Sequence, residues 1–252
     1  MASKRVLIQK LLKGIETGDA AAADVVNEAK YVQHNPQTHE GSEGLATLFA
    51  RLSKTNPRVT FVRVFEDGNF AIAHNEYDFS SLRVAFEVFR FEDGKAVEHW
   101  DNIQPMMGPN PSGRGMLDGA TEITDLDKTA ANRELVRDFA ERVLVERQLR
   151  LLDTYVDEGL VQHSPDLADG VAAYRSYLEA SENRAFRIQY HKVHRVLAEG
   201  NFVLGMSEGY RGGIHSSFYD LFRVADNKIV EHWDTIEAIA PRSGWKNENG
   251  KF

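Results

Sequence analysis

The apolar residues near the start of the chain recur with the spacing of an amphipathic helix. They are Leu7, Ile8, Leu11, Leu12 and Ile15, and Gly18-Asp19 follows as a helix end. Further helices are expected over residues 20–28 and 44–52. The period then changes to two, which predicts four strands, over residues 59–65, 70–79, 82–91 and 96–103.

The second part of the chain shows the same order of elements. Helices are expected over residues 129–145, 149–156 and 171–178, and strands over residues 186–198, 201–210, 214–224 and 229–237. Helices followed by an antiparallel meander are typical of the α+β class, in which helices cover one face of a curved sheet. We therefore expect two α+β domains in one chain.

Several stretches of sequence occur twice and in the same order, as expected for a duplicated domain. Gln-His-Asn-Pro at residues 33–36 returns as Gln-His-Ser-Pro at residues 162–165. Val-Glu-His-Trp-Asp at residues 97–101 returns unchanged at residues 230–234. The sequence thus predicts a tandem repeat with small loop insertions between the copies.

The stretch between the copies is rich in proline and glycine, which is typical of a linker. These residues are Pro105, Gly108, Pro109, Pro111, Gly113 and Gly115. We place the first copy at residues 1–107, the linker at residues 108–126 and the second copy at residues 127–252.

Composition excludes several classes of function. The 252 residues are 42% hydrophobic and 27% charged, a balance that suits folded domains rather than disorder. The net charge of -8, with scattered basic residues, argues against nucleic acid as a partner. The absence of cysteine excludes disulfides, thiolate metal sites and a cysteine nucleophile. No apolar run suits a membrane span or a secretory signal, so we expect a cytoplasmic protein with no membrane partner.

The turn between the last two strands of each copy decides which polar residues share a face of the sheet. A three-residue hairpin turn at residues 92–94 suits the Glu-Asp-Gly sequence there. Such a turn pairs Glu87 with His99 and Ala85 with Asp101, all on one face. A two-residue turn would instead move Glu87 to the face that carries Trp100. That face is otherwise apolar, so we expect it to be concave and to line a small-molecule pocket.

A tight connection at Ser80-Ser81 would add His74 to this face, opposite Glu87. In the second copy the same counting pairs Asp220 with His232, but Met206 replaces His74. The duplication is therefore unequal, and we expect function first in the pocket of the first copy.

The chemistry of the expected pocket follows from its groups. A carboxylate among apolar residues loses hydration, which raises its pKa towards that of a general base, and Asp101 is the candidate. His99, held by Glu87, and also His34 and His74, could donate hydrogen bonds to a developing oxyanion. The corresponding candidates of the second copy are Asp234, His232, Asp220 and His163.

Each candidate has a structural alternative. A buried histidine paired with a carboxylate can stabilise a sheet, and His34 and His163 can shape the chain before a proline. Trp100 and Trp233 are expected to face away from the pocket. Two histidines and a carboxylate can also bind iron. The spacing matches no compact ligand motif, however, so we expect no metal and no cofactor.

The repeated motifs resemble those of SnoaL-like domains in the nuclear transport factor 2-like superfamily. They are Gln-His-Asn-Pro at residues 33–36, Gly-Lys leading into Glu-His-Trp-Asp at residues 94–101, and Asn-Lys leading into the second Glu-His-Trp-Asp at residues 227–234. The resemblance implies two cone-shaped α+β barrels, each a curved antiparallel sheet covered by about three helices. It also implies polyketide cyclase-like chemistry, in which Asp101 and Asp234 match the family's acid/base aspartate.

Three functional hypotheses remain open. One is a cofactor-independent cyclase, isomerase or lyase acting on a small apolar carbonyl compound. The second is a non-catalytic module that binds a small-molecule ligand. The third is a structural role for one copy, in which Met206 in place of His74 marks the second pocket as decayed or specialised. The tandem pair further predicts an intramolecular pseudo-dimer through the sheets and leaves a homodimer open.

Overall fold

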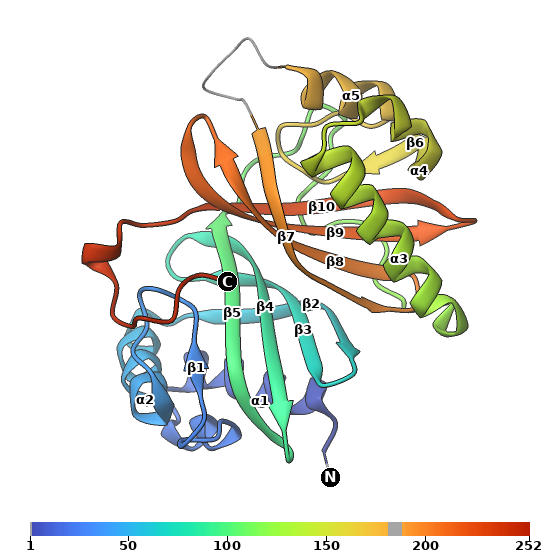
Figure 1. Ribbon diagram of the computed structural model, residues 1–252. Coiled ribbons are helices and arrows are strands. Elements are labelled where there is room, and N and C mark those ends of the chain that lie inside the picture. The colour runs from blue at the N-terminus through green and yellow to red at the C-terminus, as the bar shows by residue number, and fades with distance from the viewer. Residues whose placement is uncertain (1, 181–187) are drawn as a thin grey trace. The chain divides into compact units, whose positions relative to one another are not determined.

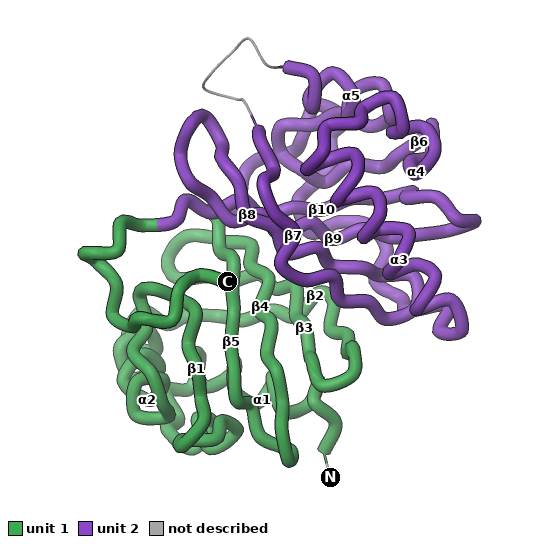
Figure 2. Tube along the Cα trace, in the orientation of Figure 1, with its two compact units in different colours: residues 1–105, 240–252 green, residues 106–239 purple. Residues whose placement is uncertain are grey.

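The computed structural model describes residues 2–180 and 188–252 and divides into two compact units. Unit 1 comprises residues 1–105 and 240–252, and unit 2 comprises residues 106–239 (Figure 2). Each unit contains one copy of the repeat. The segment that follows the last strand of each copy belongs to the other unit, a feature that the repeat itself does not indicate.

Each unit is built on a five-stranded mixed sheet (Figure 1), in the order β1-β5-β4-β3-β2 in unit 1 and β6-β10-β9-β8-β7 in unit 2. The strands of unit 1 are β1 (Val32–Gln33), β2 (Arg58–Asp67), β3 (Phe70–Asp78), β4 (Leu82–Glu92) and β5 (Lys95–Pro105). Those of unit 2 are β6 (Val156–Gln162), β7 (Ile188–Glu199), β8 (Phe202–Arg211), β9 (Ile214–Ala225) and β10 (Lys228–Ala238). The expected α+β class is confirmed, and the described strands form open sheets rather than closed barrels.

Helices pack on one face of each sheet. Unit 1 has α1 (Lys4–Thr17), the 3₁₀ helices η1 (Ala20–Val25) and η2 (Ser53–Thr55), α2 (Gly41–Leu52) and, in its C-terminal segment, η6 (Arg242–Gly244). Unit 2 has η3 (Leu126–Lys128), α3 (Thr129–Phe139), the π-helical η4 (Ala140–Val145), η5 (Leu149–Leu151), α4 (Leu152–Tyr155) and α5 (Val171–Glu179). None of the helices described here combines the length and the apolar character needed to cross a bilayer.

Two of the expected helices are shorter than the apolar pattern predicts. The helix over residues 20–28 is only a 3₁₀ segment, because Val26 is already extended and bridges to Ala96. The helix over residues 149–156 ends at Tyr155, because Val156 begins β6. The first two residues of the strand expected over residues 186–198 lie outside the described residues, and β7 begins at Ile188.

The first helix shows how local sequence signals and packing agree. Ser3 caps α1 by accepting a hydrogen bond from the Val6 backbone N–H, and Gly18 ends it with φ 69°. The buried stripe contains four of the five apolar residues predicted from their spacing, among them Ile8 and Leu11, whereas Leu7 is only partly buried. These side chains pack with Ala73 on the helix-covered face of the sheet, and the core of unit 1 lies there.

The turn between β4 and β5 differs from the expected three-residue hairpin. It contains two residues, Asp93 and Gly94, with φ 49° and 77°, as a type I′ turn requires. A bulge between Arg90 and Phe91 in the pairing then shifts the register. The bulge restores the face that a two-residue turn alone would have changed.

As a result, the expected cross-strand partners are wrong although the shared face is right. Glu87 pairs with Asp101, and Phe89 pairs with His99. Glu87 and His99 are therefore diagonal neighbours on one face. In unit 2, Asp220 likewise pairs with Asp234 and not with His232.

The register between β3 and β4 also differs from the expected one. His74 pairs with Phe86, whereas Ala73 pairs with Glu87. His74 therefore lies on the opposite face of the sheet from Glu87. There its ring stacks on Phe86 with centroids 4.1 Å apart, and its Nδ1 lies 3.1 Å from Arg63 Nη1.

Strands β1 and β6 were not expected from the sequence. β1 has only two residues and shows no alternation, and the seven-residue β6 begins within the helix expected over residues 149–156. Each runs parallel to the last strand of its copy. Gln33 pairs with His99, and Gln162 pairs with His232. These strands thus place a glutamine beside each histidine of the repeated motif.

Candidate functional site

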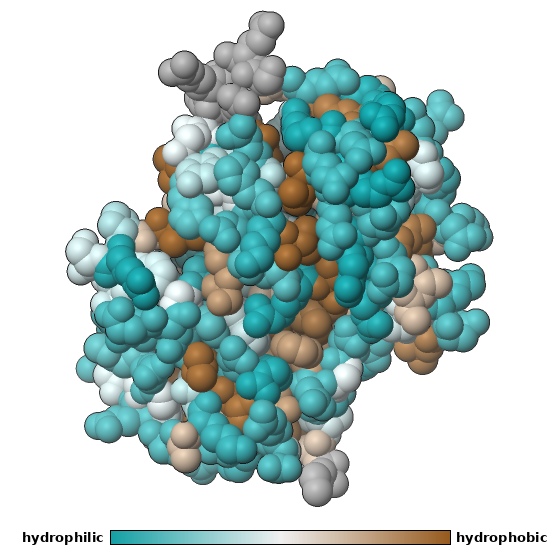
Figure 3. Space-filling view, viewed as in Figure 1, coloured by the Kyte–Doolittle hydropathy of each residue, from teal (hydrophilic) through white to brown (hydrophobic). Residues whose placement is uncertain are grey.

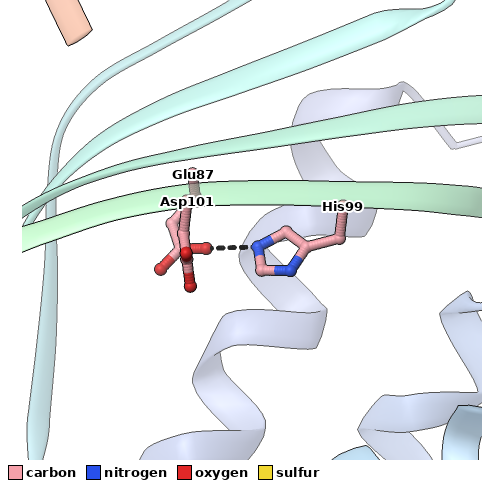
Figure 4. A group of neighbouring side chains, drawn as sticks. All are labelled: Glu87, His99 and Asp101. Atoms are coloured by element: carbon pink, nitrogen blue, oxygen red, sulfur yellow. Dashed lines mark hydrogen bonds and ion pairs between the residues drawn. The ribbon is translucent and has the colours of Figure 1, made fainter. Parts of the chain in front are cut away.

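The site of the first copy is centred on His99, on the helix-covered face of the sheet (Figure 4). His99 Nε2 lies 2.7 Å from Glu87 Oε2, and His99 Nδ1 lies 2.8 Å from Gln33 Oε1. We call Gln33, Glu87, His99 and Asp101 the first site. All four side chains are buried.

The hydrogen bonds define where the protons of His99 lie. The Asn35 backbone N–H donates to Gln33 Oε1 at 2.8 Å, so this atom is the amide oxygen. His99 Nδ1–H therefore donates to Gln33, and the second proton of the pair lies between His99 Nε2 and Glu87. Burial raises the pKa of Glu87, against the lowering effect of its hydrogen bond with His99.

Asp101 is enclosed by donors. Asn35 Nδ2 donates to its Oδ2 at 2.5 Å, and the Lys251 ammonium lies 3.2 Å from its Oδ1. Burial alone would raise the pKa of Asp101. The charges of Lys251 and His99 and the hydrogen bond from Asn35 outweigh burial and lower that pKa below its ordinary value. The expected raised pKa of Asp101 is therefore wrong.

The second copy repeats the histidine network with changed residues. His232 Nδ1 lies 2.8 Å from Gln162 Oε1, and its Nε2 lies 3.1 Å from Asp220 Oδ1. Gln162, Asp220, His232 and Asp234 form what we call the second site. Asp220 takes the place of Glu87 there.

A tyrosine hydroxyl donates to the carboxylate beside the histidine in both sites, but it comes from different strands. Tyr77 of β3 donates to Glu87 Oε1 at 2.7 Å, and Tyr190 of β7 donates to Asp220 Oδ1 at 3.1 Å. Tyr77 pairs with Val59 across the strands, and Tyr190 pairs with Gly209. The tyrosine thus lies on a different strand in each copy, while its hydroxyl donates to the equivalent carboxylate, Glu87 or Asp220.

Asp234 differs from Asp101 in its surroundings. Ser164 Oγ donates to Asp234 Oδ2 at 3.0 Å, whereas Asp234 Oδ1 is buried and has no hydrogen-bond partner among the described residues. Burial raises the pKa of Asp234 to about 6, against the lowering effect of the His232 charge. A carboxylate with this pKa can accept or release a proton near neutral pH.

A second polar atom of this region is also unsatisfied. The Tyr174 hydroxyl is buried without a hydrogen-bond partner among the described residues, and its ring stacks on His232 with centroids 5.6 Å apart. Burial raises the Tyr174 pKa well above its usual value, and the negative charges of Asp220 and Asp234 add to this effect. Tyr174 follows the positive-φ Gly170 by four residues, as Leu45 follows Gly41 in the first copy. The first copy therefore has no such hydroxyl at this position.

His34 and His163 lie away from these sites. The His34 ring stacks on Trp100 at 4.8 Å, and its Nε2 lies 3.0 Å from Glu98. His163 stacks on Trp233 at 4.8 Å and lies 2.9 Å from Glu231. Because both tryptophans face away from the sites, as expected, the structure does not bring these histidines to the aspartates. His74, on the same opposite face, is likewise not in the first site.

His34 and His163 instead contact the segments that follow the last strand of the other copy. His34 Nδ1 lies 2.9 Å from the Gly250 carbonyl oxygen in unit 1, and His163 Nδ1 lies 2.9 Å from the Gly115 carbonyl oxygen in unit 2. We call residues 240–252 and 106–118 the tails of units 1 and 2. Lys251 reaches the first site from such a tail, and the strand pattern of the sequence contained no signal for it.

The two carboxylate–histidine groups have the residue types of a metal site. Each group, Glu87, His99 and Asp101 or Asp220, His232 and Asp234, offers three ligand atoms within 4.8 Å of one another. Both ring nitrogens of each histidine are engaged by a glutamine and a carboxylate, however. We therefore assign no metal to either group.

A cavity of about 260 Å³ opens beside the second site. Tyr190, which donates to Asp220, is one of its lining residues. The other lining residues are Val145, Arg147, Leu178, Ala180, Ile188, Gln189 and His191. Hydrophilic side chains predominate on the surface seen in Figure 3, with smaller hydrophobic patches between them.

Comparison with known proteins agrees with the duplicated architecture. The family model described as a SnoaL-like domain matches residues 8–99 and 136–232. A comparison with curated proteins found no match.

Among solved structures, an LEH-like epoxide hydrolase from M. tuberculosis is 20% identical, with 44% of this chain and 85% of that chain covered and a TM-score of 0.35. A SnoaL-like polyketide cyclase from Agrobacterium tumefaciens is 10% identical, with 42% and 91% covered and a TM-score of 0.35. An NTF2-like protein of unknown function from Cytophaga hutchinsonii is 19% identical, with 42% and 93% covered and a TM-score of 0.35.

Proposed function

The chain belongs to the SnoaL-like family, with one domain in each unit, and we propose that its second copy is an acid/base enzyme acting on a small apolar carbonyl compound. The reaction class is cyclisation of the aldol type, isomerisation or lyase chemistry. Each class includes reactions that begin when a base removes a proton from the carbon next to a carbonyl group.

One observation carries the proposal. Among the described residues, the second site holds a buried acceptor without a donor, Asp234 Oδ1, and a buried donor without an acceptor, Gln162 Nε2. The Tyr174 hydroxyl, whose ring stacks on His232, is a further buried donor without an acceptor. Leaving such an atom unpaired costs about 1–3 kcal/mol, and each such atom in a native structure needs an explanation. The carbonyl oxygen of a substrate would accept a hydrogen bond from the Tyr174 hydroxyl, and Asp234 Oδ1 would take up the acidic proton of the adjacent carbon.

The roles follow from the chemistry of these groups. Asp234 takes the proton from the α-carbon and becomes a neutral acid, while the electron pair moves to the carbonyl oxygen. The Tyr174 hydroxyl donates to that oxygen as its charge develops. The hydrogen-bonded His232–Asp220 pair lies beside Asp234 and Tyr174 and stabilises the negative charge that moves from Asp234 to the carbonyl oxygen. The enolate then attacks a second carbonyl in cyclisation, or regains the proton at another carbon in isomerisation.

The pKa of Asp234 suits this role. A general base works best when its pKa lies near the operating pH, and the pKa of Asp234 is raised to about 6. In the first site, Lys251 and Asn35 already occupy both oxygens of Asp101. The unequal duplication therefore favours the second copy, contrary to the expectation drawn from His74.

Solvent exchange at the α-carbon tests the proposal without knowledge of the natural substrate. The full chain is incubated in D₂O with cyclohexanone, acetophenone and 2-tetralone, and deuterium incorporation is followed by proton NMR. Asp234→Asn is expected to lower the enzymatic rate by about 10² to 10⁴-fold, because the base is lost. Tyr174→Phe is expected to lower it by about 10²-fold, because one oxyanion donor is lost.

Asp101→Asn is the matched control, since it changes the equivalent aspartate of the first site and is expected to keep the wild-type rate. No exchange with any of these ketones, together with tight binding that Asp234→Asn weakens, would instead support the binding module.

A further inference from the structure

Lys251 brings a buried positive charge into the first site. Its ammonium lies 3.2 Å from Asp101 Oδ1, and each of the two side chains is only 3% exposed. Lysine is almost never this deeply buried unless its charge is paired. The ion pair is therefore an interior feature of unit 1 and not a contact of its surface.

The tail of unit 1 is held in place by hydrogen bonds on the N-terminal side of Lys251. Asn249 Nδ2 donates to the Gln33 carbonyl oxygen at 3.0 Å, and Asn247 Nδ2 donates to the Asn35 carbonyl oxygen at 2.7 Å. The Gly250 carbonyl oxygen lies 2.9 Å from His34 Nδ1. The backbone before Lys251 is thus fixed to the strand end that carries Gln33.

The tail of unit 2 has the same contact but a different residue after it. The Gly115 carbonyl oxygen lies 2.9 Å from His163 Nδ1, as that of Gly250 does from His34. The next residue is Met116, which is buried like Lys251 but uncharged. Asp234 Oδ1, which corresponds to the oxygen nearest Lys251, has no hydrogen-bond partner among the described residues.

We propose that Lys251 is a positioning residue that silences the first site. Its ammonium holds Asp101 as a charged, ion-paired carboxylate and occupies the oxygen that a substrate proton would have to reach. The residue at this one tail position thus decides which copy can act as an acid/base site. The ion pair follows from the positions of Lys251 and Asp101 alone. The silencing of a reaction rests on the proposed function.

The titration of Asp101 tests the ion pair directly. The titratable groups facing Asp101 are His99, Glu87, Tyr31, Tyr77 and Lys251. Aspartate carboxyl carbons are labelled with ¹³C in the full chain, and the Asp101 signal is assigned by its loss in Asp101→Asn. In wild type and in Lys251→Arg, which keeps the charge, Asp101 is expected to stay ionised between about pH 5 and 8.

Lys251→Met, which copies the second tail, is expected to raise the Asp101 midpoint by at least about one pH unit. If Lys251→Met does not fold, as judged by its melting curve, Lys251→Gln replaces it. An Asp101 midpoint that is the same with and without the charge overturns the proposal, because a purely structural lysine would leave it unchanged.

Deuterium exchange then tests the silencing. Asp234→Asn removes the base of the second site, and adding Lys251→Met is expected to raise the remaining exchange rate by about tenfold or more. A further Asp101→Asn should abolish that gain. Suppose that wild type is active and Lys251→Met shifts the Asp101 midpoint. If adding Lys251→Met to Asp234→Asn then restores no exchange, the proposed silencing by Lys251 is wrong. If wild type promotes no exchange, the proposed function fails and the silencing fails with it, whereas the titration still decides the ion pair.

Discussion

Asp101 and Asp234 stand at the same position of the repeat, and both are buried, yet their pKa values shift in opposite directions. Burial acts on both in the same sense. The difference comes from Lys251 and Asn35, which contact Asp101, and from the lone hydroxyl of Ser164 at Asp234. The electrostatic partner, not burial, decides the ionisation state of each aspartate.

The opposite shifts predict a pH dependence of stability. In the folded state the pKa of Asp234 is about 6, whereas it is near 3.9 in the unfolded chain. The folded state therefore binds the proton more tightly, and stability falls as the pH rises from about 4 to 7, by about 3 kcal/mol from this group. Urea unfolding of wild type and Asp234→Asn over this pH range measures the contribution. Equal pH slopes for the two proteins would contradict it.

The sequence predicted that Glu87, His99 and Asp101 lie close together, because alternation along two strands places their side chains on one face. It could not reveal Tyr174 as a site residue, because its spacing on α5 is also that of a core residue. Lys251 was beyond prediction for another reason. Its contact with Asp101 depends on where a tail without periodic pattern lies.

At the scale of elements, the hairpin between β4 and β5 shows how two irregularities can cancel. A two-residue turn moves the register by one residue, which would turn the other side chains towards the helices. The bulge moves it by one more residue in the same direction, so that the expected side chains face the helices although their partners differ. The sequence contains both signals, Asp93-Gly94 for the turn and the alternation around Phe89. It contains no separate signal for the bulge, so the face was predictable and the pairing was not.

The turn itself makes a testable prediction. Gly94 has φ 77°, and Asn227 occupies the same turn position in unit 2 with φ 58°. Gly94→Ala is expected to destabilise unit 1 by about 1 kcal/mol, since alanine tolerates this conformation poorly. Gly94→Asn, which copies unit 2, should cost clearly less. Thermal unfolding of the three proteins measures the order, and equal losses for alanine and asparagine would show that left-handed strain is not the cause.

At the scale of the whole molecule, each unit includes a tail from the other copy. This tail is the segment that follows the last strand of that copy. Unit 1 is completed by residues 240–252, and unit 2 contains residues 106–118. The simple division into two copies and a linker did not anticipate this, because the repeat is visible only in the strands. The pseudo-dimer through the sheets stays a prediction.

Removing one tail contact should therefore loosen one unit locally. Asn247 Nδ2 donates to the Asn35 and Thr38 carbonyl oxygens at 2.7 and 3.1 Å. Asn247→Ala is expected to speed amide hydrogen exchange around residues 33–38, corresponding to about 1–3 kcal/mol of local stability. Asn110→Ala, which removes a 2.7 Å contact with the Gln162 carbonyl oxygen, should act on unit 2 instead. Loosening of the same region by both variants would contradict the separate roles of the tails.

The central claim is that the second copy, and not the first, carries the acid/base chemistry. The most direct measurement compares the rates of α-carbon deuterium incorporation by wild type, Asp101→Asn and Asp234→Asn under identical conditions. Wild type and Asp101→Asn are expected to have about equal rates, and Asp234→Asn is expected to be slower by about 10²-fold or more. A full rate in Asp234→Asn, or its loss in Asp101→Asn alone, would contradict it.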